Sequence, residues 1–409
     1  MIIKLALRNV FRHKTRSIFG IISIVIGVSL MILYSGIFEG SNISFIESMI
    51  ETGTGDLRLY TKEYYEEIDK LPLENLFTNY DSLGKLLEGE FGISAVAPRL
   101  EFTAFLSDGE SDLPLIGVGI DPEIDKRVFN LDEYIERGRY LKKYEQGIMI
   151  SASTAEAFKV DTGAYITVIA RTKYGSISAD DFEVVGIFKT YNPDVDEVNF
   201  FIDLKKAQEF LDLGDEFSVP VVKLIDRAQA PVIATTLEKE VFNGNAKVKT
   251  WFEMTKDMRQ IIDQKSSFAV IFVSLLIIMA AFGIMNTMLM AYFERMKEMG
   301  TIMALGMTEK QVYRLFLLEG VIIGLIGGII GFIIGAGFNY LISVKGISIE
   351  SLTGGGVQYV TAGGKMYSVF DLKDAVIYTL IGFFTSVIST YFPARRIKKL
   401  SPAEVLRKN

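Results

Sequence analysis

Hydrophobic and polar positions divide the chain into four long apolar runs and one long stretch of mixed polarity. The first run, Ser17 to Ile37, carries no charged residue, and the other three follow Ser266. A helix that crosses a bilayer needs about 20 apolar residues, and one mid-helix Asp, Lys or Arg costs roughly 2.5–3.5 kcal/mol on insertion scales. We therefore predict four transmembrane helices, over residues 17–37, 266–292, 320–342 and 375–392.

The first run follows a basic start, so it could also be a cleaved signal peptide. It is longer than the apolar region of a usual signal peptide, and no A-x-A-like cleavage site follows it. A retained helix is therefore favoured. The predicted fold is a membrane protein with its four helices in a 1+3 arrangement, with one large domain over residues 38–264 between helices 1 and 2.

The segment between the first and second runs has short stretches in which apolar and polar residues alternate, separated by turn residues, as in β-strands. Predicted strands cover residues 55–60, 115–120, 165–170, 182–188 and 221–225. Predicted helices between them cover residues 80–88, 153–158, 204–211 and 231–242. This pattern indicates an α+β domain, for which one or two lobes are both compatible with the sequence.

Basic residues near the ends of the runs predict the orientation, because cytoplasmic loops are rich in Lys and Arg. The N-terminal segment 1–16, the loop 293–315 and the tail 393–409 are basic, with Lys4, Arg8, Arg12, Lys14, Arg16, Arg295, Lys297, Lys310, Arg314, Arg395, Arg396, Lys398, Lys399, Arg407 and Lys408. The loop 343–374 has only Lys345, Lys365 and Lys373. We expect a multi-pass protein of the inner (plasma) membrane with both termini in the cytoplasm and the α+β domain outside.

Composition argues against an enzyme. The chain has no cysteine, which excludes disulfides, thiol catalysis and cysteine-based metal sites. Its only histidine, His13, lies in the basic N-terminal segment, so a Ser-His-Asp triad or a histidine-based zinc site cannot be built. The net charge of −7 comes mainly from the central segment. No catalytic residue, metal site or nucleic-acid partner is predicted.

Two local patterns resemble ligand sites and fail on their details. The acidic cluster Asp194, Asp196 and Glu197 lacks the Gly and Glu that an EF-hand loop requires, so it is interpreted as a solvated loop. The stretch Gly363-Gly364-Lys365 resembles the end of a Walker A loop. However, Tyr359 stands where a glycine is needed and Met366 stands where Ser or Thr is needed. The chain is therefore expected to bind no cofactor itself.

Glycines recur along the third run with four-residue spacing. Because glycine allows helix backbones to approach closely in lipid, this stripe predicts a tight helix contact, within the subunit or across a dimer. The candidate packing residues are Gly320, Gly324, Gly328, Gly331 and Gly335, with Gly327 as a further member.

The loop after the second run contains a short apolar helix, predicted over Thr301–Leu305 and closed by Gly306, a typical C-terminal cap residue. The next helix is expected to begin within Gln311–Glu319. A short apolar helix on the cytoplasmic side suits docking of a cytosolic partner. Taken alone, an interfacial helix that lies on lipid headgroups fits equally well.

The stretch from Arg295 to Val312 (RMKEMGTIMALGMTEKQV) resembles the R-x-R-E-I-G-x-x-x-A-L-G-A motif of MacB/FtsX-type ABC transporter permeases, with Lys297 at the second basic position. The N-terminal ALRNVFRHKTR and the tail FPARRIKKLSPAEVLR are similar to the corresponding segments of this family. The segments around Gly138–Leu141 and Phe182–Phe188 resemble parts of its periplasmic domain. The resemblance covers nearly the whole chain.

The resemblance implies that the chain is a permease subunit. It would pair with a second copy of itself or with a paralogue, and the pair would bind a dimer of cytosolic ABC ATPases, which bind ATP and Mg²⁺. The implied coupling residues are Glu298, Met299, Gly300, Met303, Ala304, Leu305 and Gly306. ATP hydrolysis would then move the outer domain without cargo crossing the bilayer. The layout is nearest to the lipoprotein-releasing (LolC/LolE-like) branch, which adds membrane lipid and a periplasmic lipoprotein carrier as partners.

Two alternatives stay open. The first is a MacB-like permease that exports peptides or small molecules, although that branch usually carries a fused ATPase and this chain has no Walker A motif. The second, from another class, is a membrane-anchored sensor or regulator that transports nothing. Association with an ATPase, and its loss on Leu305→Asp, would separate the sensor from the transporter.

Overall fold

The computed structural model of the chain describes residues 2–348 and 365–397. Its internal contacts divide the chain into two compact units, a helical unit and an α+β domain that comprises mainly residues 43–260. Gly363 and Gly364 of the Walker-like stretch, and the tail from residue 398, lie outside the described residues.

Long helices form the helical unit. Among the described residues, four are long and apolar enough to cross a membrane: α2 (Lys14–Met49), α11 (Lys256–Glu294), α13 (Glu309–Lys345) and α15 (Leu372–Ile397). Each contains one of the apolar runs and extends beyond it. The extension has a simple cause: charged residues are costly in the hydrocarbon core, but they do not end a helix.

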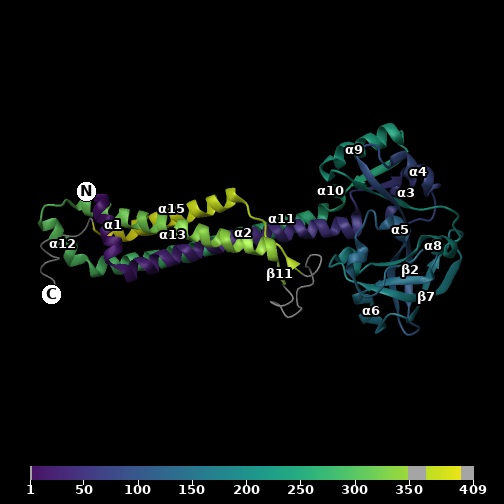
Figure 1. The fold of residues 1–409 in the computed structure, drawn as a ribbon, viewed down its shortest axis with the longest axis horizontal. Helices are drawn as coiled ribbons and strands as arrows, with labels where there is room; N and C mark the ends of the chain where they lie inside the picture. The colour runs from purple at the N-terminus through teal and green to yellow at the C-terminus, as the bar shows by residue number, and fades with distance from the viewer. Residues whose placement is uncertain (1, 349–364, 398–409) are drawn as a thin grey trace. The chain divides into compact units, whose positions relative to one another are not determined.

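Two shorter helices, α1 (Ile2–Arg12) and α12 (Met296–Ala304), lie at the same end of the helical unit (Figure 1). The predicted helix over Thr301–Leu305 was too short, because the alternating charges that precede it also adopt helical structure. One hydrophobic cluster joins the helices of this unit and includes Val10, Ile24, Val28, Ile284, Met288, Met299, Met303, Phe316, Ile323 and Ala394.

A ten-stranded sheet forms the centre of the α+β domain. Its strands are β1 (Leu57–Thr61), β2 (Ile93–Ser107), β3 (Asp112–Ile120), β4 (Ile135–Gly138), β5 (Gly147–Ser151), β6 (Tyr165–Arg171), β7 (Ile177–Phe188), β8 (Asn199–Asp203), β9 (Val219–Leu224) and β10 (Ala246–Thr250). The order is β10-β1-β9-β2-β3-β8-β5-β7-β4, and β6 pairs with β2 and β7. Two further short strands are β11 (Ile347–Ser348) and β12 (Lys365–Met366).

The long strand β2 connects two halves of this domain. Its first part pairs with β9, with Ala97 opposite Val221. Its second part pairs with β3 and β6, with Phe105 opposite both Pro114 and Ile169. Separate hydrophobic clusters fill the two halves, one around Phe217 and Leu224, the other around Phe102 and Phe200. The α+β domain thus has two halves, each with its own hydrophobic cluster, on one sheet.

Short helices cover the sheet, and all of them except α9 begin after a residue whose side chain caps the helix. They are α3 (Lys62–Glu66), α4 (Tyr80–Leu87), α5 (Pro122–Asp125), α6 (Ala152–Phe158), α7 (Pro193–Asp196), α8 (Leu204–Phe210), α9 (Ala230–Thr236) and α10 (Trp251–Met254). The Asp203 carboxylate, for example, accepts hydrogen bonds from the backbone N–H groups of Lys205 and Lys206. Every strand and helix predicted in this domain overlaps an observed one.

A buried ion pair fastens α5 to β2. Arg99 Nε lies 2.8 Å from Asp125 Oδ1, and its guanidinium stacks 3.5 Å from the centre of the Phe129 ring. The Tyr140 hydroxyl donates to Asp125 Oδ2 at 3.3 Å. Burial, reinforced by the charge of Asp125, raises the pKa of Tyr140 well above its usual value, so this phenol stays protonated.

The acidic cluster around Asp196 closes a turn. The Asp196 carboxylate accepts hydrogen bonds from the backbone N–H groups of Thr190 and Tyr191 and from the Thr190 hydroxyl, at 2.7–2.9 Å. Burial raises the pKa of Asp196, and these hydrogen bonds oppose that rise. The residues that the structure describes contain no group of His, Cys, Asp and Glu side chains that could hold a metal ion.

Candidate functional site

The predicted coupling residues form two faces of α12. Met299, Gly300 and Met303 are buried against the helical unit. Leu305, at the end of the helix, is 83% exposed, with Ala304 and Gly306 also exposed beside it. Glu298 is partly exposed. The structure therefore separates residues that anchor the helix from residues that a partner could reach.

The chain turns sharply after α12. Gly306 has φ of 104°, a conformation that favours glycine, and its N–H donates to the carbonyl of Met303. This agrees with the predicted helix end. Thr308 and Gln311 then form a capping box, and α13 begins at Glu309, slightly earlier than predicted. Leu305 stands directly before this turn and is exposed to solvent.

Three polar side chains meet at the start of α12, and we call this group the polar joint. They are Asn9, Arg295 and Glu319. Arg295 Nη1 donates to both carboxylate oxygens of Glu319, at 2.8 and 2.9 Å. Asn9 Nδ2 donates to Glu319 Oε1 at 2.7 Å. Arg295 is 6% exposed and Glu319 is 2% exposed. Residues from α1, from the start of α12 and from α13 thus meet at one buried carboxylate.

The predicted glycine stripe packs against two different helices. On one side, a Cβ added to Gly320 would lie 2.3 Å from Thr390 Oγ1 of α15, and one added to Gly324 would lie 3.0 Å from Ser386 Cβ. The Ser386 hydroxyl also donates to the Gly320 carbonyl at 2.9 Å. Gly320 and Gly324 therefore permit the close approach of α13 and α15.

The other side of the stripe faces α2. A Cβ on Gly331 would lie 2.9 Å from Val28 Cβ, and one on Gly335 would lie 3.0 Å from Ser29 Cα. Gly327 makes a similar approach to Ile24. Gly328 has more room than the sequence suggested, since its added Cβ would be 3.4 Å from Thr379 Cγ2. These glycines thus pack α13 against α15 and α2 of the same chain.

A second polar contact joins helices at the opposite end of α13 from the polar joint. Asn339 Nδ2 donates to the carbonyl of Ile32 at 3.2 Å, and the Ser368 hydroxyl donates to the carbonyl and side-chain oxygens of Asn339 at 2.7 and 2.9 Å. Asn339 is 1% exposed. The first and third apolar helices are thus held together by polar contacts as well as by glycine packing.

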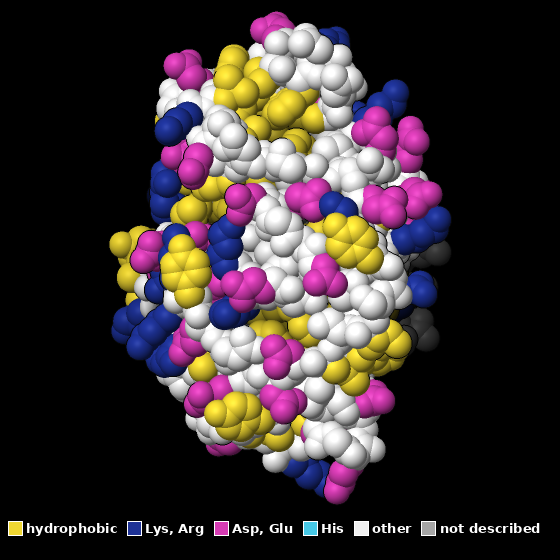
Figure 2. Space-filling model, turned by 90° about the vertical axis from the view of Figure 1, so that its right-hand side faces the viewer, with side chains coloured by type: hydrophobic (Ala, Val, Ile, Leu, Met, Phe, Trp, Pro, Cys, Tyr) yellow, Lys and Arg dark blue, Asp and Glu magenta, His cyan; other side chains and the backbone are white. Residues whose placement is uncertain are grey.

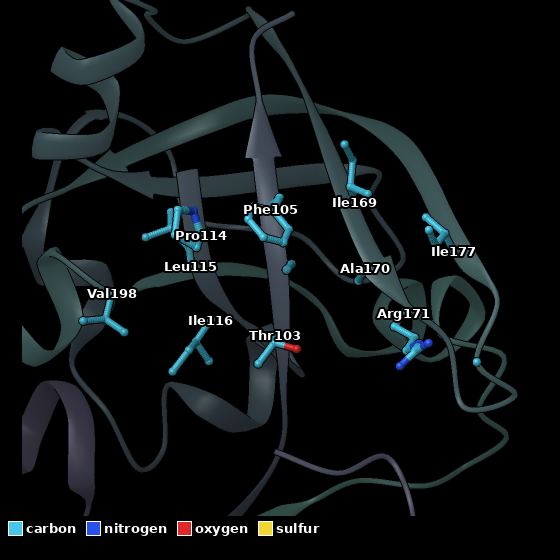
Figure 3. A pocket seen from close by; sticks show the side chains of 12 residues that line it. Thr103, Phe105, Pro114, Leu115, Ile116, Ile169, Ala170, Arg171, Ile177 and Val198 are labelled. Atoms are coloured by element: carbon cyan, nitrogen blue, oxygen red, sulfur yellow. The ribbon is translucent and has the colours of Figure 1, made fainter. Parts of the chain in front are cut away.

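The α+β domain carries an apolar groove of about 580 Å³ on the sheet face opposite the β2 core residues. Ile169, Phe105 and Pro114 stand side by side on β6, β2 and β3, as their register requires (Figure 3). Ile116, Ile177 and Val198 extend the lining, and Arg171 lies at one side. Phe105 is 51% exposed and Ile177 is 78% exposed. Exposed apolar surface on adjoining strands makes this groove a candidate for contact with another molecule.

Hydrophobic side chains also reach the surface elsewhere on this domain. Figure 2 shows one face of the molecule, on which hydrophobic side chains form separate groups among acidic and basic side chains. Isolated exposed apolar residues are ordinary on soluble domains. The groove differs because its apolar residues adjoin one another on neighbouring strands.

Sequence reasoning missed the groove and the polar joint. The joint had a signal in the sequence: Glu319 is an acidic residue directly before the apolar run, and Arg295 opens the motif that carries the family resemblance. An ionisable residue inside a transmembrane helix is costly unless it is paired, and Glu319 stands at the edge of such a helix. The groove had a weaker signal, because it depends on strand pairing between residues more than 60 positions apart in the chain.

Two families match the chain. Residues 17–240 match the MacB-like periplasmic core domain, and residues 270–402 match the FtsX-like permease C-terminal family. The lipoprotein-releasing system transmembrane protein LolC of Neisseria meningitidis is 25% identical over 346 residues, which cover 82% of this chain and 83% of that protein. The macrolide export ATP-binding/permease protein MacB of Acinetobacter baylyi is 22% identical and covers 98% of this chain, with 59% of its own length matched.

The periplasmic region of MacB from Actinobacillus actinomycetemcomitans, known from a crystal structure, aligns with 54% of this chain and 97% of its own. Its TM-score is 0.36 and its identity is 15%. The two family matches confirm the resemblance drawn from the Arg295–Val312 motif. The chain therefore belongs to the FtsX-like ABC transporter permeases with a MacB-like periplasmic core domain.

Proposed function

We propose that this permease couples ATP hydrolysis by a separate cytosolic ATPase dimer to movement of its α+β domain, and that its cargo is lipoprotein. The main support for this coupling is the structure of α12, a short helix that lies between two apolar helices in the sequence. Its inner face is buried and Leu305 at its tip is 83% exposed. Such a tip offers an apolar anchor for a pocket on another protein.

The proposed orientation places α12 in the cytoplasm, in a 1+3 arrangement with both termini on that side of the inner membrane. In its support, α1 and α12 lie at the same end of the helical unit (Figure 1). This end carries Lys4, Arg8, Arg12 and Lys297 among its basic residues. A concentration of Lys and Arg favours the cytoplasmic side.

Lipoprotein release is favoured over export for two reasons. LolC of Neisseria meningitidis is 25% identical to this chain over 346 residues, and MacB of Acinetobacter baylyi is 22% identical. In addition, the apolar groove of the α+β domain offers a surface for an apolar part of the cargo or of a periplasmic lipoprotein carrier. A second permease subunit, identical or paralogous, completes the proposed complex. ATP and Mg²⁺ bind in the ATPase.

The docking proposal is tested by co-purifying the chain with its ATPase after Leu305→Asp. We expect at least about a tenfold loss of ATPase binding, since a charge would replace an apolar anchor at the centre of the contact. Ile225→Asp, at a 78% exposed apolar residue of the α+β domain, is the matched control and is expected to bind normally. Undiminished ATPase binding by Leu305→Asp would remove α12 as the docking element.

The cargo is tested in proteoliposomes that contain the permease complex and a fluorescent acylated lipoprotein. ATP-dependent transfer of the lipoprotein to a soluble carrier is the expected result. ATP-dependent movement of a macrolide without lipoprotein release would favour the export alternative. A chain that associates with no ATPase would favour the membrane-anchored sensor.

A further inference from the structure

The carboxylate of Glu319 is the meeting point of three segments of the helical unit. Arg295 approaches it from the start of α12 with two hydrogen bonds, and Asn9 approaches it from α1 with one. Arg295, the N-cap residue of α12, also donates through Nε to Glu298 Oε2 of that helix at 3.3 Å. The guanidinium is therefore fixed on both sides, by a carboxylate of α12 and by one of α13.

Burial makes this arrangement stiff. Arg295 and Glu319 are 6% and 2% exposed, so neither charge can exchange its partner for water at low cost. One guanidinium nitrogen, Nη1, contacts both carboxylate oxygens at 2.8 and 2.9 Å, and Nε holds Glu298, so two sides of the guanidinium are occupied by charge-assisted contacts. Any tilt of α12 that kept this contact would move α13 with it.

The Asn9 contact extends the connection to the first apolar helix. α1 and α2 meet at His13, and the junction is held by backbone hydrogen bonds from His13 to Asn9 and from Ser17 to His13. The Ser17 hydroxyl also donates to the carbonyl of Val10 at 2.7 Å. A displacement at Glu319 can thus reach α2 through α1, as well as directly through the glycine contacts of α13.

We propose that Glu319 is a positioning residue that transmits movement of α12 to α13 and, through Asn9 and α1, to α2. This inference rests on the proposed function, in which an ATPase docks on α12. Glu319 contacts neither the ATPase nor cargo in this scheme. Its role is to make α12, α13 and α1 move as one body.

The first experiment compares Glu319→Gln with wild type in the reconstituted complex. Gln keeps the shape but removes the charge that holds Arg295. We expect the ATPase to co-purify normally with Glu319→Gln. The amount of lipoprotein released per ATP hydrolysed should fall at least about threefold, which is typical of residues that couple two sites without contacting a ligand at either one. Glu309→Gln, at an exposed position of the same helix, is the control and should release normally.

Arg295→Gln provides a second variant if Glu319→Gln is poorly folded. It removes the opposite member of the same buried pair and should lower lipoprotein release per ATP hydrolysed by a similar factor. An unchanged ratio of release to hydrolysis in Glu319→Gln would overturn the proposal. Loss of ATPase binding with an unchanged melting temperature would also overturn it, because Glu319 would then determine docking.

A third measurement needs no ATPase, so it separates this inference from the proposed function. The chain has no cysteine, which allows clean spin labelling at Leu305→Cys and at Phe338→Cys, both exposed. The distance distribution between the labels in the permease alone should be narrow, and it should broaden in Glu319→Gln. Equal widths would contradict the positioning role, whether or not an ATPase docks on α12.

Discussion

Replacing Gly320 by alanine tests the close contact between α13 and α15. The added Cβ would lie 2.3 Å from Thr390 Oγ1 and 2.7 Å from Thr390 Cβ, whereas carbon atoms pack at about 3.5 Å or more. Thr390 is fully buried, and its hydroxyl donates to the carbonyl of Ser386 at 2.8 Å. Its β-branched side chain has little freedom to rotate away.

The helices would have to separate by about 1 Å to accept the methyl group. Overpacking of this kind costs roughly 1–3 kcal/mol. Separation would also stretch the Ser386–Gly320 hydrogen bond, and interhelical hydrogen bonds in membrane proteins contribute about 0.6 kcal/mol on average. Alanine gains up to about 1 kcal/mol over glycine in helix propensity. The net expectation is a destabilisation of about 1–2 kcal/mol.

The assay is thermal unfolding of the full-length chain in detergent. Gly337→Ala is the matched control, because Gly337 lies on the same helix and its added Cβ would meet no atom within 4 Å. Gly320→Ala should melt at a lower temperature than wild type, while Gly337→Ala should melt at the same temperature or slightly higher. Equal melting temperatures for the two variants would refute the packing argument.

Four further outcomes follow from the structure. Met303→Asp should lower the melting temperature of the chain in detergent, because this side chain is 8% exposed and would bury a charge. Asp125→Asn should cost the α+β domain about 3–5 kcal/mol in chemical unfolding, since it leaves the Arg99 charge unpaired. Phe105→Asp should reduce lipoprotein release without changing ATPase binding, measured in the same proteoliposomes. Burial raises the pKa of Asp203, so the folded domain binds this proton more tightly than the unfolded chain does. The free energy of unfolding should therefore fall as the pH rises from the unfolded-state pKa to the folded-state pKa of Asp203. The melting temperature of Asp203→Asn, measured against pH, should lack this fall.

Hydrophobic periodicity predicted the elements well because burial determines them locally. The four apolar runs all lie within helices, and the strand over Tyr165–Ala170 follows its period-two pattern with Ile166 and Val168 in the core. Helix ends were predicted less well. The sequence placed a helix start near Ser266, but α11 begins at Lys256, because a polar flank can be as helical as the apolar run it precedes.

The site at α12 was predicted in part. The motif led to α12 and to its tip at Leu305, but it did not separate buried from exposed positions. Met303 was expected to take part in docking, whereas in the structure it packs into the helical unit. That distinction depends on how α12 lies against α13, which is a tertiary property. The polar joint depends in the same way on residues that are up to 310 positions apart.

The most direct test of the account follows movement of the α+β domain during ATP binding. With no natural cysteine in the chain, a single spin label at Tyr174→Cys, 79% exposed on that domain, can be paired with a label on the second permease subunit of the assembled complex. The account predicts that trapping ATP on the ATPase shifts the distance distribution, and that Leu305→Asp abolishes the shift. An intact, ATP-bound wild-type complex with an unchanged distance distribution would contradict it.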